Sequence, residues 1–103
     1  MLTLGIDSST QSVKALVYSV EDKSVVTAVS VNFGKDLPEF GCPDGFLSNE
    51  DPLVRQADPL LWVAALDKVL QKLADSFDTS KIDAIGGDGQ QHGSVYLGDG
   101  WSA

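Results

Sequence analysis

The sequence has 103 residues, of which 43% are apolar, so it can form one small domain or part of a larger one and is too apolar for a disordered tail. Fifteen acidic residues against seven basic ones give a formal charge of −8, which repels the phosphate backbone of nucleic acid. A single cysteine, Cys42, excludes an internal disulfide, and with one histidine, His92, it cannot complete a zinc site.

No run approaches the about 20 apolar residues of a membrane span. Residues 1–17 contain Asp7 and Lys14 and lack the basic start and apolar run of a signal peptide. We therefore expect a cytoplasmic protein with neither a membrane nor nucleic acid as its partner.

Three strand-like runs open the chain. Leu2–Ile6 is a short apolar run, and the polar residues 7–12 after it are typical of a turn. Residues 13–20 alternate, and a third β-rich run covers residues 25–33. The alternation places Val13, Ala15, Val17 and Ser19 on one face of the second strand. The short connections between the runs predict an antiparallel meander.

Residues 34–57 show neither the helical nor the strand period. They carry three prolines and several glycines among many charged residues. A structureless loop of about 20 residues is unusual inside a compact domain and is often functional. The sequence leaves open whether this loop is an excursion near a site or a surface insertion.

A helix is predicted to begin at Asp58-Pro59, where Asp58 can cap free amides and Pro59 fits the first helical position. Residues 78–80 end it. Helical spacing predicts a stripe that faces the core, made of Trp62, Leu66, Val69, Leu70, Leu73 and Phe77. The opposite face carries Lys68, Gln71, Lys72 and Asp75.

The end of the chain predicts two short strands around a glycine-rich segment. Ile82–Ile85 leads into residues 86–93, Ser94–Leu97 follows, and residues 98–100 form a turn. The order β-β-β-α-β predicts an α/β mixed sheet with a helix on one face. The chain stops directly after a turn, so we expect an incomplete domain, whose cut sheet would expose an apolar edge that favours self-association.

Residues 4–14 form the first cluster that could carry chemistry. Its turn offers backbone amides and hydroxyls, which can cradle phosphate oxygens. Asp7 could hold Mg²⁺ through water, and Lys14 adds positive charge. The spacing is not that of a Walker A loop. The alternative is an ordinary hairpin whose polar turn satisfies its own backbone.

Residues 86–93 form the second cluster, at the end of a predicted buried strand. Four glycines in eight positions allow close backbone approach to a ligand. Gln90, Gln91 and His92 offer both donors and acceptors, which suits sugar hydroxyls. The glycines do not match the dinucleotide fingerprint. The alternative for His92 is a histidine hydrogen-bonded to the backbone.

Three segments in order resemble the FGGY family of carbohydrate kinases, and the xylulose kinases within it in particular. They read LGIDSSTQSVKALVYS, ADPLLWVAALDKVLQKL and GDGQQHGSVYL. The resemblance covers essentially the whole chain, which would be a small part of a family member. It implies an actin-like, ribonuclease H-like fold of two domains with ATP and sugar between them, and residues 1–103 would begin the first domain.

The resemblance also implies roles for individual residues. Asp7 would help to place Mg²⁺, and Gln91 and His92 would contact a ketose. The phosphate-facing residues would be Thr10, Gln11, Ser12 and Lys14. No residue of this segment corresponds to the general base or to the adenosine site, so the segment alone would be inactive. Asp88 departs from the family pattern, in which a small residue is usual, and would either bind a sugar hydroxyl, tune His92 or point away.

The implied reaction is transfer of the ATP γ-phosphoryl group to the terminal hydroxyl of a ketopentose, such as D-xylulose to D-xylulose 5-phosphate. Another sugar or polyol, such as ribulose or glycerol, remains an alternative substrate. Two other classes stay open, a non-kinase actin-like nucleotide-binding protein and a small binding module.

Overall fold

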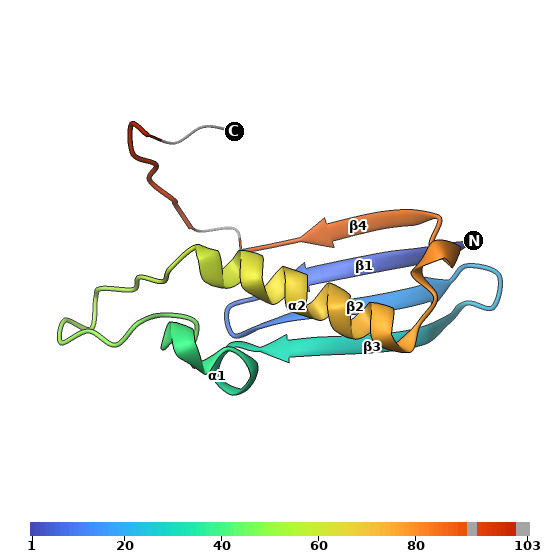
Figure 1. The fold of residues 1–103 in the computed structure, drawn as a ribbon, viewed down its shortest axis with the longest axis horizontal. Helices are drawn as coiled ribbons and strands as arrows, with labels where there is room; N and C mark the ends of the chain where they lie inside the picture. Colours follow the sequence, from blue (N-terminus) through green and yellow to red (C-terminus); the bar gives the residue numbers. More distant parts are fainter. Residues whose placement is uncertain (91–92, 101–103) are drawn as a thin grey trace.

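A computed structural model describes residues 1–90 and 93–100. A four-stranded mixed sheet in the order β3-β2-β1-β4 carries the long helix α2 on one face (Figure 1). The strands are β1 (Leu2–Ser8), β2 (Ser12–Ser19), β3 (Ser24–Asn32) and β4 (Ala84–Asp88). The helices are α1 (Phe33–Asp36), η1 (Pro38–Phe40), α2 (Leu60–Ser76) and η2 (Thr79–Lys81).

The predicted meander is confirmed, because β1 pairs antiparallel with β2 and β2 pairs antiparallel with β3. The predicted alternation of β2 is also confirmed: its residues from Val13 to Ser19 are alternately buried and exposed. The prediction that residues 7–12 form a turn was wrong at both ends, since β1 runs to Ser8 and β2 starts at Ser12. The polar side chains do not end these strands, because the backbone pairing of β1 with β2 extends through the pair Asp7–Lys14.

Helix α2 begins at Leu60, one residue after the predicted Pro59, and the Asp58 carboxylate accepts a hydrogen bond from the Leu60 amide at 2.9 Å, as the predicted capping role requires. The predicted stripe is confirmed at Val69 and Leu73, which are fully buried, and Trp62 and Phe77 are partly buried against the core. It was wrong at Leu66 and Leu70, and it missed Leu61 and Ala65. The fully buried residues are Leu61, Ala65, Val69 and Leu73. Leu66 and Leu70 are 40% and 38% exposed. Residues 60–66 are all apolar, so helical spacing alone does not choose a face there, and packing on β2 and β3 makes the choice.

Two lysines on the predicted outer face of α2 reach across to β3 and to α1, which follows it. Lys68 Nζ donates to the Asp36 carbonyl at 2.8 Å, and Lys72 Nζ donates to the Ser30 carbonyl at 3.0 Å. The Asp36 carboxylate accepts from the Asn32 amide at 2.7 Å, and this bond, followed by the charge of Lys72, lowers the pKa of Asp36. These contacts join α2 to the end of β3 and to α1.

The segment 34–57 is not structureless, contrary to the prediction, because α1 and η1 occupy its first part. Leu37 and Cys42 are buried in the core, and the Leu47 amide donates to the Gln56 carbonyl at 2.7 Å, which closes the outer part. These helices are only four and three residues long and lie among prolines and glycines, so they show no helical period in the sequence. The first part of the segment therefore packs against the core, whereas residues 47–53 are exposed.

Strand β4 runs parallel to β1, which confirms the mixed sheet, but it begins and ends later than the predicted Ile82–Ile85. The predicted strand Ser94–Leu97 was wrong: this segment has no regular structure, and Tyr96 is 93% exposed. A β-rich composition does not make a strand without a partner. The outer edge of β4 has no strand beside it in the described residues, and Ile85 is 70% exposed there. This is the open apolar edge that the sequence predicted, and self-association through it stays a prediction.

None of the helices within residues 1–90 and 93–100 combines the length and the apolar character that a membrane span needs.

The burial pattern of α2 predicts unequal costs for two leucine truncations. Leu73→Ala removes a fully buried side chain and should lower the free energy of unfolding by about 2–5 kcal/mol. Leu66→Ala, at a position that the sequence alone assigned to the core, should cost less than about 1 kcal/mol. Urea denaturation of both variants measures this, and equal losses would contradict the observed phase of the helix.

Candidate functional site

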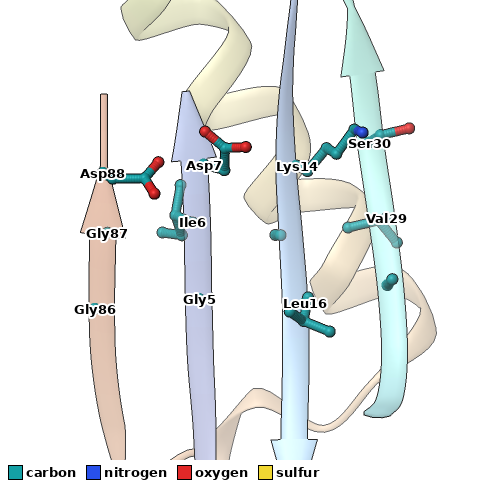
Figure 2. Close-up of a pocket in the computed structure, with 12 residues that line it drawn as sticks. Gly5, Ile6, Asp7, Lys14, Leu16, Val29, Ser30, Gly86, Gly87 and Asp88 are labelled. Carbon is teal, nitrogen blue, oxygen red and sulfur yellow. The ribbon is translucent and has the colours of Figure 1, made fainter. Parts of the chain in front are cut away.

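The two clusters singled out in the sequence lie side by side at the carboxyl ends of two neighbouring strands. Strands β1 and β4 are parallel neighbours, with Gly5 opposite Gly86 and Asp7 opposite Asp88. On the other side of β1, Asp7 pairs with Lys14, and Lys14 pairs with Ser30 of β3. The register therefore sets a polar row across all four strands, on the face opposite α2 (Figure 2).

A hollow of about 740 Å³ lies on this open face of the sheet. Its polar rim is the row Asp88–Asp7–Lys14–Ser30, and its floor continues through Gly86, Gly5, Leu16 and Ala28. Three of these four floor positions are glycine or alanine, so little side-chain bulk rises from the sheet there. A ligand lying on this face would meet backbone and small side chains below and charged groups at one end.

The electrostatics of the rim are dominated by two neighbouring carboxylates. Figure 2 shows the Asp88 side chain directed toward β1, next to Asp7 near the end of that strand. A hydrogen bond to Asp7 and then the negative charge of Asp7 raise the pKa of Asp88. Two carboxylates held together in this way repel one another when both are ionised, and a cation between them would relieve that repulsion.

The short turn Ser9–Gln11 stands beside this rim. Its Ser9 amide donates to the Ser12 carbonyl at 2.8 Å, and the Gln11 carbonyl accepts from the Phe33 amide at 3.0 Å. The Ser9 carbonyl accepts from Gln90 Nε2 at 3.2 Å. Among the described residues, the amides of Thr10 and Gln11 donate to no other group. Two adjacent free amides on an exposed turn suit an anionic oxygen.

The structure thus brings together most of the residues predicted for phosphate and metal binding. Asp7 and Lys14 line the hollow, and Thr10 and Gln11 form the exposed turn. Ser12 was placed in the turn by the sequence but lies in β2. The predicted sugar-binding residues Gln91 and His92 lie outside the described residues.

Sequence reasoning missed two contacts of this site. Gln90 was grouped with the sugar-facing residues, yet its side chain binds the Ser9 carbonyl. Gly45, in the loop 34–57, lies directly against Thr10. The length of that loop was a general signal of function, but no pattern in the sequence points to Gly45.

The described residues contain no group of three or more histidine, cysteine, aspartate or glutamate side chains placed to hold a metal ion. The pair Asp7 and Asp88 nevertheless offers the carboxylate oxygens that Mg²⁺ prefers, and this ion commonly keeps water and substrate phosphates as its other ligands. A Mg²⁺ ion that is also bound by nucleotide phosphates therefore fits these residues. A metal ion bound by protein side chains alone does not fit them as well.

The resemblance to carbohydrate kinases is confirmed by comparison with known proteins. The chain is 46% identical over 100 residues to the xylulose kinase of Rattus norvegicus, covering 96% of this chain and 18% of that protein. It is 44% identical over 103 residues to xylulose kinase 2 of Arabidopsis thaliana, covering 98% and 18%. No model of a protein family matches the chain.

The fold resembles that of a solved kinase as well. The crystal structure of a xylulose kinase from Brucella ovis matches with a TM-score of 0.67 and 26% identity, over 89% of this chain and 17% of that one. This likeness supports the predicted fold class, the mixed β-β-β-α start of a ribonuclease H-like domain. The chain spans less than a fifth of the length of each of these relatives.

The carboxylate pair predicts a pH-dependent gain in stability from Asp88→Asn. The raised pKa of Asp88 means that its charged form is disfavoured in the folded state, so stability falls as pH rises through that pKa. Removing the charge should raise the melting temperature at pH 7 by a few degrees at most, since both groups are exposed and screened. The gain should vanish in acid, where Asp88 is protonated in either state.

Thermal denaturation of Asp88→Asn at pH 7 and below the ordinary range of aspartate pKa values checks this. Asp75→Asn, on the exposed side of α2, is the matched control, because it removes the same charge away from Asp7. An equal gain for both variants would show that net charge, and not the pair, is responsible.

Proposed function

We propose that the full-length protein containing this segment is a cytoplasmic, ATP-dependent carbohydrate kinase that converts D-xylulose to D-xylulose 5-phosphate. The observation that carries the proposal is the parallel pairing of β1 with β4, which unites the polar turn with the glycine-rich strand end. The sequence identity of 46% and 44% to the xylulose kinases of rat and Arabidopsis supports this substrate class.

In this proposal the first cluster binds the nucleotide. The amides of Thr10 and Gln11, with Ser12 and Lys14 nearby, would hold phosphate oxygens of ATP. Asp7 would hold Mg²⁺ through water, and the ion when bound neutralises charge on the transferred phosphoryl group. The negative Asp7–Asp88 rim otherwise opposes an anionic nucleotide, so this proposal requires a divalent cation at the site.

The second cluster would bind the sugar. Gln91 and His92 provide donors and acceptors for the hydroxyls of a ketopentose, and Asp88 stands at the strand end that leads to them. The residue that removes the proton from the attacking hydroxyl would come from a part of the protein outside these 103 residues. The segment alone would then position ligands without completing the reaction.

A substrate panel tests the proposal directly. Purified full-length protein with ATP and Mg²⁺ should form ADP fastest with D-xylulose, and more slowly with D-ribulose or glycerol, in a coupled assay. A preference for D-ribulose or glycerol would move the protein to another sugar kinase. ATP turnover that no sugar stimulates would favour a non-kinase actin-like protein.

Two substitutions separate the proposed roles of the clusters. Asp7→Asn should lower kcat by about 100-fold or more, because it removes the carboxylate that places the metal. His92→Ala should raise KM for the sugar about tenfold, with KM for ATP little changed. Steady-state kinetics of both variants, with Asp75→Asn as a surface control, measure this split. Full sugar affinity in His92→Ala would contradict the proposed sugar site.

A further inference from the structure

All three carbonyl groups of the turn Ser9–Gln11 are contacted, each by a different part of the chain: two accept hydrogen bonds and the third lies in close steric contact. The Ser9 carbonyl accepts from the Gln90 side chain, and the Gln11 carbonyl accepts from the Phe33 amide. The Thr10 carbonyl lies against the backbone of Gly45. Residues far apart in sequence thus converge on three consecutive peptide groups.

The approach of Gly45 to Thr10 leaves no room for a side chain. A Cβ atom at Gly45 would lie 1.9 Å from the Thr10 carbonyl oxygen and 2.9 Å from its carbonyl carbon. Contacts under 3.0 Å require something to shift, so this oxygen would have to move by roughly 1 Å. Gly45 also has φ +94°, which side chains rarely adopt.

The segment around Gly45 is anchored on its other side. The Gly45 amide donates to the Cys42 carbonyl at 3.0 Å, and Cys42 is buried in the core. Pro43 packs on Gly34, where an added Cβ would lie 2.8 Å from the Pro43 Cβ. The segment therefore has little freedom to retreat, and a larger residue at position 45 would displace the turn.

Holding a carbonyl also fixes the amide of the next residue, because the peptide group is planar. The Ser9 carbonyl shares its plane with the Thr10 amide, and the Thr10 carbonyl shares its plane with the Gln11 amide. These are the two amides without a partner among the described residues. Gln90 and Gly45 thus set the directions of the groups that the proposed function assigns to phosphate.

We propose that Gly45 and Gln90 are positioning residues, which hold the turn Ser9–Gln11 so that the Thr10 and Gln11 amides face the nucleotide phosphates. The proposal rests on the proposed nucleotide-binding role of this turn. Gln90 extends from the end of β4, so it also links the sugar-facing segment to the phosphate-facing one. Neither residue needs to touch a reacting atom.

A comparison of two glycine variants in the full-length protein tests the role of Gly45. Gly41 also has a positive φ, of 66°, but an added Cβ there would meet only Leu47 Cδ2, at 3.7 Å. Gly45→Ala and Gly41→Ala therefore share backbone strain and differ in the contact with the turn. We expect kcat/KM for ATP to fall about 100-fold in Gly45→Ala, because the turn would be misplaced by about 1 Å. In Gly41→Ala we expect kcat/KM to stay close to that of the wild type.

Melting temperatures and KM for the sugar complete that comparison. Similar melting temperatures with an unchanged sugar KM would place the loss at the nucleotide site. Equal losses of activity in the two variants would overturn the role of Gly45, since strain alone would then explain them.

Gln90→Met provides a second variant that removes a hydrogen bond without adding a clash. Gln90 is exposed, so this change should leave folding intact. The proposal can therefore still be tested with this variant if Gly45→Ala does not fold. We expect KM for ATP to rise about five- to tenfold, with the sugar KM unchanged. A rise in the sugar KM alone, or no change in either, would overturn the positioning role of Gln90.

Binding of a non-hydrolysable ATP analogue with Mg²⁺, measured by calorimetry, separates this inference from the proposed function. A wild-type protein that binds the analogue but phosphorylates no sugar would refute the kinase proposal alone. Weaker binding in Gly45→Ala and Gln90→Met than in Gly41→Ala would still support the positioning role. A wild-type protein that binds no nucleotide would overturn both.

Discussion

The parallel pairing of β4 with β1 is the constraint on which the arrangement of the site depends. Parallel neighbours need a crossover, and α2 supplies it by packing Leu61, Ala65, Val69 and Leu73 against the other face of the sheet. The same pairing puts Asp88 beside Asp7 and allows Gln90 to reach the Ser9 carbonyl. The apolar burial on one face of the sheet thereby fixes the polar groups on the other.

Much of the fold could be predicted because its signals are local. The alternation from Val13 to Ser19 separated the two faces of β2, and Asp58-Pro59 located the start of α2 to within one residue. The face that the first two turns of α2 bury could not be predicted, because the apolar run 60–66 surrounds the helix and only contact with the sheet selects a face. The strand predicted at 94–97 failed for a related reason, since a strand needs a neighbour as well as a suitable composition.

The candidate site divides in the same way. Asp7, Thr10, Gln11 and Lys14 could be selected from sequence, because a carboxylate, polar turn and lysine follow one another along a single hairpin. The contacts of Gly45 and Gln90 with that hairpin could not be selected. Each depends on a close approach between segments that are distant in sequence, and the sequence alone gives no measure of such distances.

The burial of Cys42 has a practical consequence. It is the single cysteine of the sequence, it is 1% exposed, and burial raises the pKa of its thiol. A thiolate, rather than a thiol, reacts with alkylating reagents, so labelling of Cys42 must await an opening of the surrounding segment. Because the Cys42 carbonyl also accepts from the Gly45 amide, the labelling rate would report how often the segment that contacts the Ser9–Gln11 turn opens.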